Sequence, residues 1–124
     1  METPLPITIS LKVSEMEEAH PRITVNVKHK ADTDVVEVKG EIDLATAPHL
    51  DEVLSGLSAP QLVIDLQGVE FIDSTGLHCL IRVQARHDGG RRIRLVVRRP
   101  SPVIRLLELA DVTNGFIVDE VNSG

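Results

Sequence analysis

The segment Leu62-Val63-Ile64-Asp65-Leu66 and the helix signal that follows it at Ser74 decide the fold. A short, nearly continuous apolar run of this kind is typical of a strand buried on both faces of a parallel sheet. The helix that Ser74 begins has its apolar residues on one face, at Leu77, Leu80, Ile81 and Ala85. Asp88-Gly89-Gly90 ends it. The segment therefore predicts a strand that leads into a helix.

Upstream, two strands and a helix precede this segment. Residues 23–27 alternate between apolar and polar side chains, and residues 35–38 form a second strand that Gly40 ends. The turn at residues 31–34 makes the two strands an antiparallel hairpin. The next helix has Thr46 as its cap, Pro48 in its first turn and Pro60 after its end.

Downstream, the alternation of strand and helix continues. Ile93-Arg94-Leu95-Val96-Val97 is a strand, Ser101-Pro102 opens a third helix, and Phe116-Ile117-Val118 is a terminal strand or extended tail. The order strand, strand, helix, strand, helix, strand, helix indicates an α/β fold. We expect a mixed, mostly parallel sheet of about four to five strands, flanked by helices.

Length and composition limit the classes of protein that fit. The 124 residues predict one domain, residues 22–124, after an N-terminal extension, residues 1–21, that contains three prolines and an acidic patch. Apolar runs never exceed three residues, so we expect no transmembrane helix and no signal peptide. The single cysteine, Cys79, excludes an internal disulfide, fits a cytoplasmic protein and is interpreted as a small buried apolar residue.

Charge and aromatic content argue against nucleic-acid binding. The net charge is −6, and the chain has two Phe but no Trp or Tyr. It therefore lacks the positive potential that phosphates need and the aromatic platforms on which bases stack. None of the five histidines shows metal-ligand spacing. We accordingly expect no metal, no cofactor, no direct nucleic-acid partner and no membrane partner.

A ligand or partner site is expected in the loops after the parallel strands. In an open α/β sheet these loops meet at the carboxyl edge. Here they are residues 40–45, 68–75 and 98–101. The first two follow strands joined by a single crossover, so Asp43 and Ser74 should share one edge of the molecule.

Ser74 has two interpretations on physical grounds. A serine at a helix start usually caps the helix through its side-chain oxygen. The same position also suits a phosphate, because backbone N–H groups and the positive end of the helix dipole point outward there. A catalytic serine does not fit, because Ile72 stands where a nucleophile elbow has Gly and no histidine is placed to act as a base.

Two other features also have alternative interpretations. Asp43 either is a turn or capping residue or helps to position an incoming partner. The basic stretch Arg91 to Arg99 places Arg92, Arg94 and Arg98 on one strand face. These arginines either protect a solvated sheet edge or meet a protein partner with an acidic rim.

Taken together in this order and spacing, three segments resemble the STAS-domain family, and most closely its stand-alone anti-sigma factor antagonists. They are Gly40-Glu41-Ile42-Asp43-Leu44-Ala45-Thr46-Ala47, Leu62-Val63-Ile64-Asp65-Leu66 and Phe71-Ile72-Asp73-Ser74-Thr75-Gly76-Leu77. The resemblance covers about residues 22–119. It implies a STAS fold and a non-enzymatic protein whose unphosphorylated form binds an anti-sigma factor, itself a serine kinase, and so releases a sigma factor. A serine phosphatase would reverse the modification.

The resemblance also assigns residues. It implies phosphorylation at Ser74, with Thr75 as a substitute, and Asp43 as an acidic residue that helps the kinase contact. The implied partner surface comprises Asp43, Asp73, Ser74, Thr75, Gly76 and His78. The family often has Gly where this chain has His78, and we expect the bulkier side chain to narrow the choice of partner.

Two other functions remain open for a chain of this family. One is a subunit that braces a transport ATPase, and the other is a scaffold in a stress-signalling assembly. The Asp73-Ser74-Thr75-Gly76 motif favours the phosphorylation switch, because scaffold and transporter members often lack the serine. A neighbouring gene for an anti-sigma kinase or for a transporter would distinguish these functions.

Overall fold

The computed structural model describes residues 22–86, 92–111 and 116–122. The extension at residues 1–21 and the helix-ending signal at residues 88–90 lie outside the described residues. The elements in chain order are β1 (Ile23–Lys30), β2 (Thr33–Ile42), α1 (Ala47–Ser55), β3 (Gln61–Ile72), α2 (Ser74–Arg86), β4 (Arg92–Arg99), α3 (Pro102–Ala110) and β5 (Ile117–Asn122). Every predicted strand and helix is present, and Phe116-Ile117-Val118 leads into a terminal strand.

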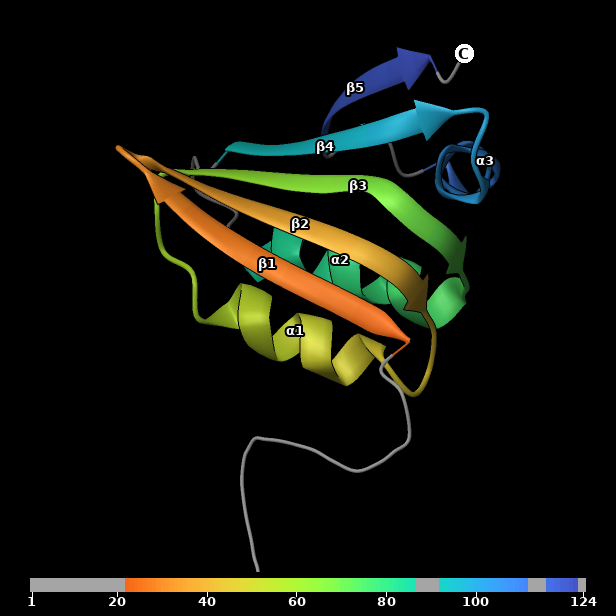
Figure 1. Ribbon diagram of the computed structural model, residues 1–124, viewed down its shortest axis with the longest axis horizontal. Helices are drawn as coiled ribbons and strands as arrows, with labels where there is room; N and C mark the ends of the chain where they lie inside the picture. Colours follow the sequence, from red (N-terminus) through yellow and green to blue (C-terminus); the bar gives the residue numbers. More distant parts are fainter. Residues whose placement is uncertain (1–21, 87–91, 112–115, 123–124) are drawn as a thin grey trace, which may run out of the picture.

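The strands form one five-stranded mixed sheet in the order β1-β2-β3-β4-β5 (Figure 1). β1 and β2 are antiparallel, which confirms the predicted hairpin. The pairs β2–β3, β3–β4 and β4–β5 are parallel. The carboxyl ends of β2 and β3 therefore lie at one edge of the sheet, where α1 and α2 begin.

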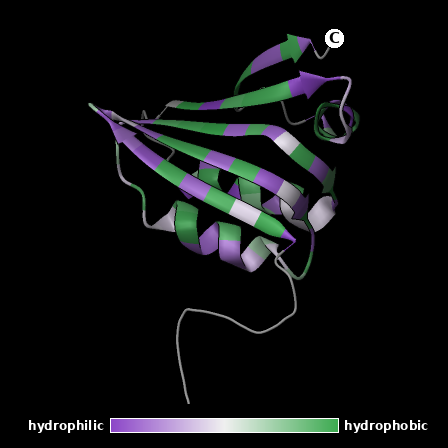
Figure 2. Ribbon diagram, in the orientation of Figure 1, coloured by the Kyte–Doolittle hydropathy of each residue, from purple (hydrophilic) through white to green (hydrophobic). Residues whose placement is uncertain are grey.

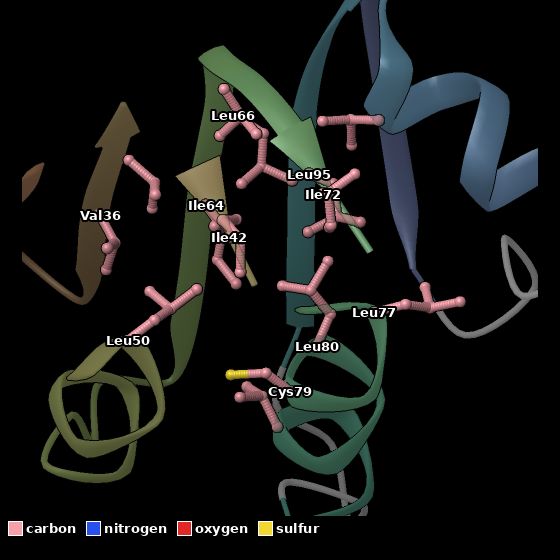
Figure 3. Close-up of a cluster of buried hydrophobic side chains, with 14 of the residues drawn as sticks. Val36, Ile42, Leu50, Ile64, Leu66, Ile72, Leu77, Cys79, Leu80 and Leu95 are labelled. Carbon is pink, nitrogen blue, oxygen red and sulfur yellow. The ribbon is translucent and has the colours of Figure 1, made fainter. Parts of the chain in front are cut away.

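The helices cover one face of the sheet, and the core lies beneath them. Figure 1 shows α1 and α2 together on the same side of β1, β2 and β3. α3 packs against β3 and β4 and contributes Val103, Ile104 and Leu107 to the same hydrophobic cluster. Figure 3 shows the strand side chains pointing toward Leu50 of α1 and Leu80 of α2. The longest helix, α2, has 13 residues, and no helix in the described residues is long and apolar enough to cross a bilayer.

Only one face of β3 is fully buried, so the prediction that residues 62–66 are buried on both faces is wrong. Leu62, Ile64 and Leu66 are buried, whereas Val63 and Asp65 are half-buried. The banding of the strands in Figure 2 shows this alternation of apolar and polar side chains. The physical reason is that the helices pack on one side of the sheet, which leaves alternate residues of the central strands facing solvent.

Strands β2 and β3 are longer than predicted. β2 continues through Gly40 to Ile42, and β3 continues to Ile72. Register shifts in the β2–β3 ladder let the two strands keep pairing beyond Gly40 and Val69. Gly40 has a φ of +103°, and a side chain there would place its Cβ 2.1 Å from the carbonyl oxygen of Arg22. Because β2 and β3 are longer than predicted, the predicted loops 40–45 and 68–75 shrink to residues 43–46 and to Asp73.

Two details of the predicted helices are corrected. The Thr46 side chain does not cap α1, because its hydroxyl donates to the carbonyl oxygen of Glu41, 2.8 Å away. Ala85 is exposed, whereas Cys79 and Val83 are buried with Leu77 and Leu80. Cys79 is thus a small buried apolar residue, as predicted. Ser101 does cap α3, since its hydroxyl oxygen accepts a hydrogen bond from the Ile104 N–H.

The basic strand β4 is not a sheet edge, so the prediction that its arginines protect an edge is wrong. β5 pairs with β4 and lies outside it. Arg94 forms an ion pair with Asp119 at 2.7 Å, and Arg99 binds Glu120 and Glu108, each at 2.6 Å. Arg94 and Arg99 therefore pair with carboxylates of β5 and α3.

Candidate functional site

The site lies where β2 and β3 end side by side. Ile42 and Ile72 are register partners in the sheet. The pairing extends one residue further, because the backbone N–H of Asp73 donates to the carbonyl oxygen of Ile42, 3.2 Å away. Asp43 follows one strand and Asp73 follows the other. The expectation that the loops of Asp43 and Ser74 share one edge is therefore confirmed.

Asp73, and not Ser74, caps α2. Its Oδ1 accepts hydrogen bonds from the backbone N–H of Thr75 at 2.9 Å and of Gly76 at 3.1 Å. Its carbonyl oxygen accepts from the N–H of Leu77. Ser74 is the first residue of the helix, and its side chain is exposed. The interpretation of Ser74 as the capping residue is therefore wrong, because the carboxylate one position earlier already binds the free N–H groups.

The hydroxyl of Ser74 makes no hydrogen bond with any residue that the structure describes. Thr75, the next hydroxyl, is half-buried. His78 is exposed and follows Ser74 by four residues, so both lie on the same outward face of α2. Of the two hydroxyl groups in the motif, that of Ser74 is the more accessible to a macromolecular partner.

Gly76 sets the height of α2 above the strands. It is buried, and a Cβ there would lie 2.6 Å from Cγ2 of Ile42 and 2.8 Å from Cγ1 of Ile72. Real side chains do not approach so closely, so the first turn of α2 rests directly on the ends of β2 and β3. Figure 3 shows Ile42 and Ile72 at this junction. The glycine of the motif therefore positions Ser74 by packing.

Asp43 organises the loop between β2 and α1. Its Oδ1 accepts hydrogen bonds from the N–H of Ala45 at 2.9 Å and of Thr46 at 3.1 Å. Its Oδ2 accepts from Nη1 of Arg22 at 2.5 Å. Partial burial of Asp43 favours a higher pKa, but the hydrogen bonds from Arg22, Thr46 and Ala45 outweigh it and hold the pKa below its ordinary value. Asp43 is thus a turn residue, and its role toward a partner stays a prediction.

Sequence reasoning missed Arg22. Its guanidinium binds Glu41 as well as Asp43, at 3.2 and 2.5 Å, and these two acceptors raise its pKa. The hairpin register brings it there, because Ile23 pairs with Gly40. No local signal at Arg22 itself indicates this contact.

Sequence reasoning also missed two exposed apolar side chains at this edge. Leu44 is 74% exposed and Phe71 is 47% exposed. Leu44 lies in the loop that Asp43 organises, and Phe71 is the register partner of Glu41. Leu44 lies outside the strands, so strand alternation makes no prediction for it, and the alternation indicates that Phe71 is exposed only when the end of β3 is known.

The chemistry available at this edge is that of a modification or binding site. In the described ranges, no group of three His, Cys, Asp or Glu residues could hold a metal ion. The third predicted loop, residues 98–101, borders a separate shallow cavity of about 550 Å³ lined by residues between Arg99 and Glu108. At the end of β2 and β3, Ser74 offers an exposed hydroxyl at the start of α2, where the helix dipole favours added negative charge.

Comparisons with known proteins agree on one family. The family model described as "Mlab, STAS domain" matches residues 25–119. The anti-sigma-F factor antagonist RsfB of Mycobacterium tuberculosis is 36% identical over 98 residues, which are 76% of this chain and 79% of RsfB. The crystal structure of an anti-sigma factor antagonist from Mycobacterium paratuberculosis is 34% identical, has a TM-score of 0.74 and covers 78% of this chain and 85% of its own. Unphosphorylated SpoIIAA, a Bacillus protein, shares the fold at 17% identity, with a TM-score of 0.60 and coverage of 79% and 89%.

Proposed function

This chain belongs to the STAS-domain family, and we propose that it is an anti-sigma factor antagonist controlled by phosphorylation of Ser74. Two relatives above 30% identity carry the name anti-sigma factor antagonist. In the proposed cycle, the unphosphorylated chain binds an anti-sigma factor that is also a serine kinase, and a sigma factor is released. Phosphorylation ends the binding, and a serine phosphatase restores it. This cycle would take place in the cytoplasm.

The observation that carries the proposal is the exposed hydroxyl of Ser74. A kinase must reach the acceptor oxygen, and Ser74 is exposed at the first position of α2. The cap of α2 is supplied by Asp73, so a phosphate on Ser74 would leave the helix start intact. Thr75 is the substitute acceptor, with a half-buried side chain.

The switch is one of affinity. A phosphate adds about −1.5 to −2 charges at pH 7. The positive end of the α2 dipole tolerates that charge, so the fold should persist. A partner surface fitted to a neutral hydroxyl would face an added charge beside Asp73 and Asp43. A loss of about 2.8 kcal/mol in binding free energy corresponds to a 100-fold weaker complex.

The other residues of the proposed surface have distinct roles. Asp43 presents a carboxylate whose direction is set by Arg22 and by two backbone N–H groups. Gly76 places Ser74 on the strand ends, and the exposed His78 contributes to the choice of partner. We assign this function to a STAS domain of residues 22–124 that follows the extension at residues 1–21.

The proposal is tested first by affinity capture from the native cell, with mass spectrometry of the bound proteins and of Ser74. The captured anti-sigma factor is then purified and titrated calorimetrically against Ser74→Ala and Ser74→Glu. We expect tight binding of Ser74→Ala, at least tenfold weaker binding of Ser74→Glu and unchanged melting temperatures. Thr75→Ala serves as the control and should still be phosphorylated.

Two results would contradict the proposal. Labelling that persists in Ser74→Ala and vanishes in Thr75→Ala would move the acceptor to Thr75. Equal affinity of Ser74→Ala and Ser74→Glu would mean that charge at position 74 is not the switch, and a transporter or scaffold role would then be favoured.

A further inference from the structure

Exposed large apolar side chains are few in the part of the chain that the structure describes. They are Leu44, Phe71, Leu109, Ile117 and Val121. Single exposed apolar residues are normal on a protein surface, but neighbouring ones mark interaction sites. Two of the five, Leu44 and Phe71, lie at the edge where β2 and β3 end and α2 begins. Ser74 is at this same edge.

Leu44 is exposed in a turn that is fixed by hydrogen bonds. The N–H groups of Ala45 and Thr46 both donate to Oδ1 of Asp43, and the Asp43 N–H donates to the Thr46 hydroxyl at 2.9 Å. These bonds close a tight loop around Leu44, and Leu44 is 74% exposed. A pre-organised loop backbone loses little conformational entropy when a partner covers it.

Phe71 is held on the outer face of the sheet end. It pairs with Glu41 in the register, while its neighbour Ile72 pairs with Ile42 and points into the core. Phe71 therefore points away from the core by the alternation of the strand. Phe71 is 47% exposed.

The groups around these two residues are mainly acidic. Glu41, Asp43, Glu70 and Asp73 lie at this edge, and Arg22 pairs with the first two. A protein interface typically has an apolar centre and a polar rim. The chemistry that matches this edge is a partner surface with an apolar centre and basic residues around it.

We propose that Leu44 and Phe71 are the apolar anchors through which this chain binds its anti-sigma factor, at the sheet edge where Ser74 also lies. The inference rests on the proposed function and adds to it the energetic centre of the interface. It also gives a reason why a phosphate on Ser74 would strongly weaken the binding of the anti-sigma factor. The added charge would have to be desolvated at an apolar contact, where binding energy is concentrated.

The test uses the full chain and the purified anti-sigma factor identified by the capture experiment. Titration calorimetry compares Leu44→Ser and Phe71→Ser with two control variants, Leu109→Ser and Val121→Ser. Leu109 of α3 is 76% exposed and matches Leu44 in exposure. Val121 of β5 is 41% exposed and matches Phe71. We expect at least tenfold weaker binding for Leu44→Ser and for Phe71→Ser, and unchanged binding for the controls.

Folding and chemistry are separated by conservative variants. Leu44→Met and Phe71→Leu keep an apolar side chain and should restore most of the affinity. Thermal melting of every variant shows whether the fold is intact. Leu44→Ser alone keeps the inference testable if Phe71→Ser proves unstable, because Leu44 is mostly exposed and contributes little to the core.

A benzophenone photo-crosslinker at position 44 identifies what covers the patch. A crosslinked peptide from the anti-sigma factor supports the inference. A peptide from a second copy of this chain, or from its own residues 1–21, overturns it. If the wild-type chain binds the anti-sigma factor and the serine variants bind equally well, the inference fails and the proposed function stands. If the wild-type chain binds no anti-sigma factor, both fail.

Discussion

Asp73 and Ser74 are adjacent residues with different tasks. The carboxylate of Asp73 binds the N–H groups of Thr75 and Gly76, while the hydroxyl of Ser74 faces solvent. A capping residue is replaceable only at a cost in stability, whereas an exposed first-turn residue is not part of the cap. The motif thus separates the group that holds the helix from the group that we propose is modified.

This separation predicts opposite sensitivities at two neighbouring positions. Asp73→Ala should lower the free energy of unfolding by about 1 kcal/mol, because the N–H groups of the first turn lose their acceptor. Ser74→Ala should change it by less than about 0.5 kcal/mol. Urea denaturation measures both, and Asp73→Asn should recover most of the loss. A larger cost for Ser74→Ala than for Asp73→Ala would show that Ser74 is the cap.

At the scale of elements, the contact of α2 with β2 and β3 determines where the site lies. Gly76 is the point of closest approach, and its missing side chain lets the helix rest on Ile42 and Ile72. The strand ends, the cap and the acceptor are therefore one packed unit. A change in the packing at Gly76 should therefore shift the position of Ser74 in the first turn of α2.

We predict that of two glycine-to-alanine substitutions only the one at Gly76 is destabilising. Gly76→Ala should lower the free energy of unfolding by about 1–2 kcal/mol, because overpacking outweighs the gain in helix propensity. Gly56→Ala is the matched control: Gly56 has φ −86°, and its added Cβ would lie 3.6 Å from the nearest atom. It should be neutral or stabilising by up to about 1 kcal/mol. Urea denaturation decides, and a stabilising Gly76→Ala would contradict the packing argument.

At the scale of the whole molecule, one hydrophobic cluster joins three helices to the sheet. Cys79 lies inside it with no exposed surface. Burial raises the pKa of the Cys79 thiol to about 11, and the nearby charge of Asp51 acts in the same direction. At pH 8 only about one thiol in a thousand is ionised, and the thiolate is the reactive form.

Cys79 should therefore report on global unfolding. We predict that an aromatic disulfide reagent will label it very slowly at pH 8 in native buffer, and that labelling will rise with urea in step with the loss of circular dichroism. Heat-unfolded protein provides the fully reactive control. Rapid labelling without urea would show instead that α2 opens locally, and the site with it.

The sequence alone determined the elements and the family of this protein. Alternation in residues 23–27, the helix signal at Ser101-Pro102 and the Phe71 to Leu77 motif are local patterns, and local patterns encode strands, caps and resemblance. The order of those elements restricted the fold to a mixed α/β sheet. It also placed Asp43 and Ser74 at one edge.

Only the tertiary structure decided which groups meet at the site. The extension of β3 to Ile72 depends on pairing with β2, and the ion pairs of Arg22 and Arg99 join residues far apart in the chain. The sequence pointed to Ser74 as the cap, and only the structure assigns the cap to Asp73, because Asp and Ser are both good caps and the two residues are adjacent. The physical reason is the same in each case: strand register and packing distance are set by contacts between elements, and no local window of sequence contains both partners.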